Sequence, residues 1–241
     1  MEEVLKLFAS IALDPPGSRI ARQLAKVQVS SLLRTLFPGD LVVWRNFPEP
    51  LYPVERKGLH EMDFQPDRVL QTGSDLAEVL RRARMQQAAS LVEHAERYEW
   101  VILADPGVMA LRNWDHLFEN KEGDVLVVRD EKRWIDPSLL AIRGRIFETL
   151  VRRLEGFEVS QAWADALNTT IETEGLQVED FERGEVVRVF EEGVGFPAVL
   201  NASVVLFKGG APENQAKVAF ALHMMKTFGD RDGLFLDLLE S

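Results

Sequence analysis

The segment of this 241-residue chain that could most directly do chemistry is Asp105-Pro106-Gly107. It follows a continuous apolar run, Trp100 to Ala104 (WVILA), of the kind found in strands that are buried on both faces. A carboxylate at the end of such a strand can face a ligand, but an Asp followed by Pro can also simply shape a turn. Both alternatives stay open for Asp105. One carboxylate alone is a poor metal site, because a hard cation needs several oxygen ligands.

The other residue types that carry chemistry show no spacing typical of a known site. The chain has no cysteine, which excludes disulfides, thiolate nucleophiles and zinc–thiolate sites. His60, His94 and His223 are isolated and form no His-x-x-x-His pair. Asp115-His116 is interpreted as the first turn of a helix beside a partly buried histidine, rather than as an acid–base pair. No nucleophile elbow, Walker loop or dinucleotide fingerprint is present.

Two further groups of residues are candidates for a site, and the sequence selects no member of either. Carboxylates flank the predicted strand ends near Asp105, and any of them could be catalytic: Glu122, Asp124, Asp130, Glu131 and Asp136. Tryptophans could stack on sugar rings, although most are expected to pack in the core: Trp44, Trp100, Trp114, Trp134 and Trp163.

The elements that must position Asp105 are expected to be alternating strands and helices. Apolar runs predict strands over residues 4–13, 40–47, 59–64, 100–104, 124–128, 139–142, 186–190 and 202–207. Helical spacing and capping residues predict helices over residues 19–36, 74–98, 147–154, 160–171 and 214–228, with a short one near Trp114. This alternation predicts an α/β sandwich whose central, mainly parallel sheet contains residues 41–44, 101–103 and 125–128, with helices on both faces.

Composition narrows the class of protein. The net charge of −11 and the scattered basic residues, of which Arg81, Arg82 and Arg84 are the tightest group, argue against nucleic-acid binding. No stretch approaches the roughly 20 apolar residues that span a bilayer, and the acidic start is unlike a signal peptide. The absence of cysteine fits a reducing cytoplasm. No repeat or linker divides the chain, so we expect a single domain over residues 1–241.

The segment from Tyr98 to Glu119 resembles the metal-site segment of GT-A glycosyltransferases, above all the glycogenin-like family 8 branch and its bacterial relatives. In that family a buried strand ends in Asp-x-Asp and is followed by an apolar stretch, Arg-Asn and a short helix. Here Leu111-Arg112-Asn113 and residues 115–118 (DHLF) fit that order. Further segments are similar in the expected order: residues 30–34, 37–43, 140–144, 181–186 and 204–210.

The resemblance implies a GT-A-like three-layer sandwich and transfer of a sugar from a nucleotide diphosphate. In the family the two motif carboxylates hold Mn²⁺ or Mg²⁺ against the diphosphate of the donor. Here Gly107 stands at the second carboxylate, and apolar residues stand where the family has a late histidine. Residues 85–87 (Met-Gln-Gln) stand where relatives often have a lysine, and residues 136–138 (Asp-Pro-Ser) replace an Asn-Ser-Gly.

The residues that the resemblance implies for donor binding are Asp105, Gly107, Arg84, Lys208 and Gly209. No metal ligand set and no catalytic residue is assigned. We therefore expect a glycosyltransferase-like protein that is weakly active or inactive and binds Mn²⁺ or Mg²⁺ weakly or not at all. Its expected partners are a nucleotide sugar and a glycan or protein acceptor. The alternatives are a non-catalytic nucleotide-, glycan- or protein-binding domain and an unrelated α/β binding domain.

Overall fold

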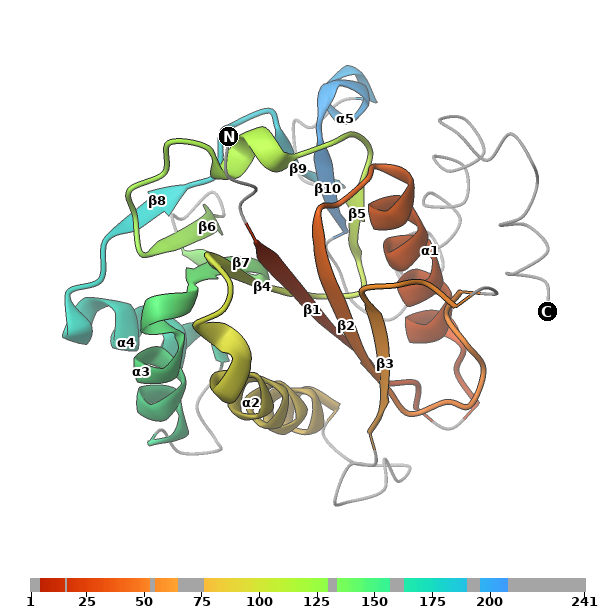
Figure 1. The fold of residues 1–241 in the computed structure, drawn as a ribbon, viewed down its shortest axis with the longest axis horizontal. Coiled ribbons are helices and arrows are strands. Elements are labelled where there is room, and N and C mark those ends of the chain that lie inside the picture. The colour runs from red at the N-terminus through yellow and green to blue at the C-terminus, as the bar shows by residue number, and fades with distance from the viewer. Residues whose placement is uncertain are drawn as a thin grey trace.

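The computed structural model describes residues 5–15, 17–52, 55–64, 76–129, 134–156, 163–189 and 196–207, with the side chains of residues 76–78, 163–164 and 196 excepted. These residues form an α/β sandwich in which a twisted central sheet separates two layers (Figure 1). The predicted fold class is therefore confirmed. Within the described residues, no helix combines the length and the apolar character that crossing a membrane requires.

In the part of the chain that the structure describes, the central sheet has seven strands in the order β3-β2-β1-β4-β7-β6-β8. Its strands are β1 (Lys6–Ala12), β2 (Gly39–Arg45), β3 (Leu59–Asp63), β4 (Trp100–Ala104), β6 (Val125–Arg129), β7 (Ile135–Arg143) and β8 (Val178–Asp180). The first four strands in this order, from β3 to β4, are parallel to one another, as are β6 and β8, whereas β7 runs antiparallel to both β4 and β6. The start of β7 therefore lies beside the carboxyl end of β4.

A smaller sheet and the helices complete the two outer layers. The smaller sheet has the order β5-β10-β9, from β5 (Val108–Ala110), β10 (Val204–Phe207) and β9 (Val186–Val189). The helices are α1 (Ile20–Arg34), α2 (Leu76–Ala95), α3 (Gly144–Glu155), α4 (Trp163–Glu174) and α5 (Phe196–Asn201), with a 3-10 turn η1 (Asp115–Phe118). In Figure 1, α2, α3 and α4 lie together on one side of the central sheet and α1 lies on the other.

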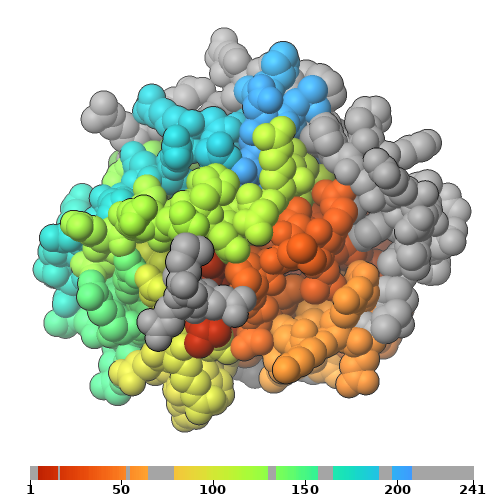
Figure 2. Space-filling view, turned by 45° about the horizontal axis from the view of Figure 1, so that its top comes forward, coloured from red at the N-terminus to blue at the C-terminus, as the bar shows by residue number. Residues whose placement is uncertain are grey.

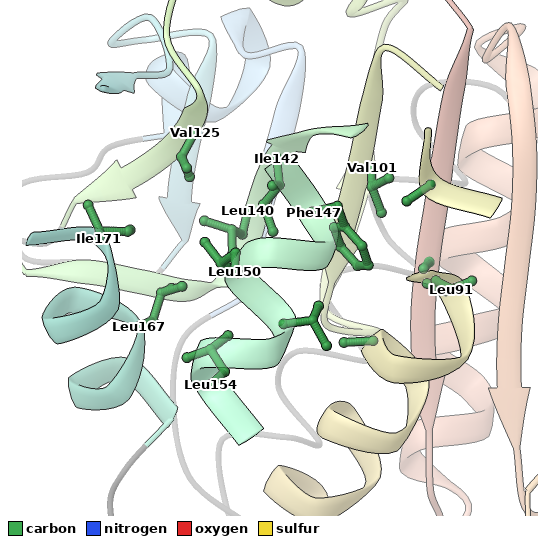
Figure 3. Close-up of a cluster of buried hydrophobic side chains, with 14 of the residues drawn as sticks. Leu91, Val101, Val125, Leu140, Ile142, Phe147, Leu150, Leu154, Leu167 and Ile171 are labelled. Atoms are coloured by element: carbon green, nitrogen blue, oxygen red, sulfur yellow. The ribbon is translucent and has the colours of Figure 1, made fainter. Parts of the chain in front are cut away.

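Successive side chains of β4 point to opposite faces of the central sheet, so this strand contributes to the core on each face. Val101 packs into a core beneath α2, α3 and α4, where Phe147 of α3 fills the centre (Figure 3). Trp100 and Ile102 point the other way, into a core shared with α1, η1 and the smaller sheet. Trp100, Val101 and Ile102 are fully buried. The uninterrupted apolar run in the sequence is thus explained by burial on both faces.

The amino edge of the central sheet is closely covered. In Figure 2, which brings the top of Figure 1 forward, the yellow-green segment that contains η1 lies across the molecule against the orange-red of α1. Trp114 and Phe118 of this segment pack on each other and on Phe8 and Trp100 of the sheet. Lys6 of β1 adds an ion pair of 2.9 Å to Asp115. We infer that this edge serves to hold the layers together.

Most predicted elements are present, and the differences have simple causes. The strand predicted over residues 139–142 begins earlier, at Ile135. The prediction missed its first residues because Pro137 interrupts the apolar run, at a point where the pairing with β6 is irregular. β5 and β8 were not predicted, because strands of three residues are too short to show alternation. The short α5 was also missed. The helix predicted over residues 214–228 lies outside the described residues.

Candidate functional site

The candidate site lies at the carboxyl edge of the central sheet, where Asp105 follows β4. Its backbone continues the pairing with β7, since its N–H donates to the Ser138 carbonyl at 2.8 Å. Its carbonyl accepts from the Val108 N–H at 3.0 Å and from Nε2 of Gln28 on α1 at 2.6 Å. The backbone of Asp105 is therefore fixed by β7, by its own turn and by α1. Its side chain is 37% exposed.

The Asp105 carboxylate forms an ion pair with Arg84 of α2. Nη1 of Arg84 also donates to the Pro137 carbonyl at 3.1 Å, so one guanidinium bridges α2, β4 and β7. Burial lowers the pKa of Arg84 to about 10, against the opposing effect of the Asp136 carboxylate. Arg84 is still charged at neutral pH. The resemblance had pointed to Arg84 and Asp105 separately, and the structure brings the two together.

A second ion pair lies next to the first. Oδ2 of Asp136 is 2.8 Å from Nε of Arg188 on β9, and both side chains are about nine-tenths buried. Oδ1 of Asp136 accepts from the Ser138 N–H at 2.9 Å. The pairing of β6 with β7 shifts register here, and such irregularities re-aim side chains. Asp136 is thereby directed toward the smaller sheet, which supplies Arg188.

The sequence analysis missed Arg188, although a signal was present. Residues 186–189 (VVRV) place one arginine inside an apolar strand, and a buried arginine is almost always paired with a carboxylate. The identity of that partner depends on contact between two sheets, which sequence spacing does not reveal. Asp136 was only one of five candidates for this reason.

The cluster formed by Arg84, Asp105, Asp136 and Arg188 contains two guanidinium groups and two carboxylates, so it carries no net charge. These residues do not fit a divalent cation. The Asp105 carboxylate is already neutralised by Arg84, and Gly107 offers no side-chain oxygen. Within the described ranges, no group of three or more His, Asp or Glu side chains is arranged to hold a metal.

Gly107 belongs to the tight turn between β4 and β5. Its carbonyl accepts from the Phe207 N–H at 3.2 Å, and a Cβ built on Gly107 would lie 3.5 Å from Cβ of Phe207. A side chain at this position would therefore pack against β10. Lys208 and Gly209, the two remaining residues implied by the resemblance, lie outside the described residues.

Asp14 is a further carboxylate at the carboxyl edge, after β1, and it is also engaged within the chain. Its Oδ1 accepts from the Ala21 N–H at 2.8 Å, in the first turn of α1, and its N–H donates to Oδ1 of Asn46 at 2.9 Å. Burial raises the pKa of Asp14, against the lowering effect of the hydrogen bonds that its carboxylate accepts from the α1 backbone and of the Arg22 charge. The first turn of α1, where an anion is favoured, is thus already occupied by Asp14.

Other candidates lie away from this edge. Asp124 precedes β6 at the amino edge, where it accepts from the Gln177 N–H at 3.1 Å and from Arg145. Glu122 lies in the same approach to β6. Asp130 and Glu131 are outside the described residues. Among the carboxylates that the sequence could not rank, Asp136 is the one that the structure places beside Asp105.

Asp115 and His116 also have separate partners. Asp115 pairs with Lys6, whereas Nε2 of His116 lies 3.5 Å from the Glu185 carboxylate. The His116 side chain is 45% exposed, because η1 turns Leu117 and Phe118 rather than His116 toward the core. The interpretation of Asp115 as a residue of a helical first turn is consistent with η1.

Comparison with known proteins identifies the fold. No protein-family model and no curated protein matches the sequence. The structure is similar to that of the galactosyltransferase LgtC in complex with donor and acceptor sugar analogues, with a TM-score of 0.59 and 10% identity over 93% of this chain and 96% of that one. It is also similar to the bifunctional glycosyltransferase WbbM, with a TM-score of 0.61 and 12% identity over 100% of this chain. This chain spans about half of WbbM (52%). The architecture is that of a GT-A-like glycosyltransferase.

Proposed function

We propose that this chain is a glycosyltransferase-like protein, related to nucleotide-sugar transferases, that works without a divalent metal and has little or no sugar-transfer activity. The observation that carries the proposal is the ion pair between Arg84 and Asp105. It engages the one motif carboxylate that the resemblance retains. We further propose that residues 1–241 act as a single domain in the cytoplasm, in line with the absence of cysteine.

The physical argument concerns the leaving group. When a nucleotide diphosphate departs, negative charge develops on it, and preorganised positive charge aimed at that position is usually the largest catalytic contribution. In the cluster, Arg84 is paired with Asp105 and Arg188 with Asp136. Their positive charges are therefore already neutralised by carboxylates of the chain itself. Losing one preorganised donor typically costs on the order of a hundred- to a thousandfold in rate.

A second candidate function is metal-independent sugar transfer. It is favoured by the partial exposure of Asp105, because water can solvate that carboxylate if a donor diphosphate takes its place beside Arg84. Arg84 would then supply the charge that a metal supplies elsewhere. The two candidates differ in whether turnover without metal depends on Arg84.

A donor-hydrolysis screen tests both. Uridine- and guanosine-diphosphate sugars are incubated with the native chain, Asp105→Ala and Arg84→Met, with and without Mn²⁺. Glu99→Ala is a matched control, because Glu99 is also a partly exposed carboxylate paired with an arginine, Arg143, at the opposite end of β4. We expect the same background rate in all four proteins. Turnover without metal that Arg84→Met abolishes would establish the second candidate.

Calorimetry gives an independent measurement for the metal. Titration of the native chain with Mn²⁺ in the presence of uridine diphosphate should show no metal-dependent binding. Tight binding that requires Mn²⁺ and is lost in Asp105→Ala, but kept in Glu99→Ala, would contradict the proposal and show that other oxygens complete a metal site.

A further inference from the structure

A second group of polar side chains lies where β9 and β10 begin, at the end of the smaller sheet that is away from Asp105. Glu185 directly precedes β9, and its Oε2 accepts from Oγ of Ser203, directly before β10, at 2.5 Å. The same Oε2 lies 3.5 Å from Nε2 of His116 in η1. The N–H groups of Ser203 and Val204 both donate to the Glu185 carbonyl at 2.9 Å. Glu185 thus joins the starts of two strands to η1, and in Figure 2 the cyan segment that leads into β9 lies against the yellow-green segment of η1.

β9 has an ionic contact near each end, and the two contacts differ in kind. Near its far end, Arg188 pairs with Asp136 at 2.8 Å, and both side chains are about nine-tenths buried. At its start, Glu185 faces His116, and their side chains are 32% and 45% exposed. An arginine stays charged throughout the pH range of folded proteins, whereas a histidine gains its charge between about pH 8 and 5. Of the two arginine or histidine partners, His116 is therefore the one whose charge changes in this range.

The other charged groups around this contact do not substitute for Glu185. Asp115, the neighbour of His116 in η1, pairs with Lys6 of β1 at 2.9 Å. The remaining charged residues beside η1 and in the turn before β9 are exposed: Arg112, Glu119, Glu182 and Arg183. Water and salt screen such exposed charges. Glu185, whose carboxylate is fixed by the buried Ser203 hydroxyl, is therefore the group that responds most directly to a charge on His116.

We propose that His116 and Glu185 form a pH-sensitive latch, which holds the starts of β9 and β10 to η1 more tightly below about pH 6 than above about pH 7. An imidazolium adds an attraction between opposite charges that a neutral imidazole lacks. Opening the corner around Glu185 therefore costs more free energy when His116 is charged, so the latch tightens as the pH falls and loosens as it rises. Arg188 and Asp136 hold the far end of β9 at both pH values. The latch uses none of the residues on which the proposed function rests, and either can fail without the other.

The test follows the two amides that the latch protects. Hydrogen exchange of the Ser203 and Val204 amides is measured by NMR at about pH 5.5 and about pH 7.5, on either side of the histidine titration. Each rate is divided by the intrinsic rate of an unstructured peptide at that pH. Protection in the native chain should be about two- to fivefold higher at the lower pH, as expected for an exposed ion pair. His116→Gln and Glu185→Gln should both lose this difference, because each removes one charge and keeps a polar side chain.

His94→Gln is the matched control. His94 is also an exposed histidine, in the last turn of α2, and it forms no ion pair with a described residue, so this variant should keep the full difference. Titration of other groups, including Asp14, is common to all four proteins and cancels in the comparison. Thermal unfolding verifies that the variants are folded.

Three results would overturn the latch. The first is protection of the two amides in the native chain that does not rise at the lower pH. The second is a pH difference that persists in His116→Gln or disappears in His94→Gln. The third is an equal change at the amides of β4, because the effect would then belong to the whole chain and not to the corner around Glu185.

Discussion

The two ends of β4 each have an arginine–carboxylate pair in different surroundings. At the carboxyl end, Arg84 binds Asp105 and the Pro137 carbonyl. At the amino end, Arg143 binds Glu99 and the backbone carbonyls of residues 121 and 123, and its guanidinium carbon lies 4.0 Å from the centre of the Trp100 ring. The two carboxylates are similarly exposed, at 37% for Asp105 and 41% for Glu99.

Exposure of the carboxylate therefore does not distinguish a candidate site from a structural contact. The two arginine–carboxylate pairs differ instead in the groups that surround each arginine. Arg143 is held by partners on several sides and by an aromatic face, which suits a group that joins layers. Arg84 lies next to a second ion pair and on the same edge as the half-exposed Trp134. We infer that the amino end of β4 is built for stability and that the carboxyl end is where a ligand can bind.

The largest expected effect comes from removing each arginine. Arg143→Ala should lower the free energy of unfolding by about 3 kcal/mol, because hydrogen bonds to charged groups and a cation–π contact are lost together. Arg84→Ala should cost about 1–2 kcal/mol, because water can reach the Asp105 carboxylate. Urea denaturation of both variants measures the difference. Equal losses would mean that the carboxyl end is as structural as the amino end.

A matched pair of glycines sharpens the comparison. A Cβ on Gly144, after β7, would lie 2.1 Å from the Tyr98 carbonyl oxygen and 2.3 Å from that of Ala95, whereas one on Gly107 would make only ordinary contacts with Phe207. Gly144→Ala should therefore destabilise the chain by about 1–3 kcal/mol through overpacking. Gly107→Ala should stay within about 0.5 kcal/mol. A larger loss for Gly107→Ala in thermal unfolding would reverse this assignment.

Tyr98 provides a smaller effect at the amino end. Its hydroxyl donates to Oδ2 of Asp40 at 2.6 Å, and burial, with that hydrogen bond, raises its pKa to about 12. The phenol holds its proton more tightly in the folded chain, so the stability it contributes is present below pH 10 and is lost between about pH 10 and 12. Tyr98→Phe should cost about 1 kcal/mol at neutral pH.

Ultraviolet titration verifies the Tyr98 assignment. The native chain should show a tyrosine that ionises near pH 12, and Tyr98→Phe should lack it. If that transition persists in the variant, the hydrogen bond to Asp40 is not its cause.

The smallest expected effect is a pH dependence at the carboxyl edge. Burial raises the folded pKa of Asp14 above its unfolded value of about 4, so the folded chain binds this proton more tightly. The contribution of Asp14 to the free energy of unfolding is therefore largest below pH 4 and falls as the pH rises through the folded pKa. Asp14→Asn keeps an acceptor for α1 and removes this titration.

Denaturation of the native chain and Asp14→Asn across pH 3 to 7 measures the difference, in which other titrations cancel. The native chain should lose stability relative to the variant as the pH rises, by less than about 1 kcal/mol. The opposite slope would mean that the hydrogen bonds to α1 outweigh burial and that the folded pKa is lowered.

The sequence predicted the central sheet well, because a strand that is buried on both faces is apolar at every position and can be recognised on its own. The run WVILA and residues 125–128 are apolar throughout, and they form β4 and β6. The candidate site was predicted only in part. Asp105 and Arg84 were named from the resemblance, but their pairing depends on how α2 packs against the sheet. Arg188 was missed because its partner belongs to another sheet.

The position of β4 also bears on how the chain folds. β6 and β7 are close in sequence and can pair early. β1 pairs with strands that are far from it in sequence, since Lys6 lies beside Gly39 of β2 and Trp100 of β4. Closing such loops is entropically costly before any contact is gained, and parallel pairing of this kind is slow. The arginine pairs at the two ends of β4 join that strand to α2 and to β7 rather than to β1. Both can therefore form before this closure, and refolding kinetics should show the pairing of β1 as the last step.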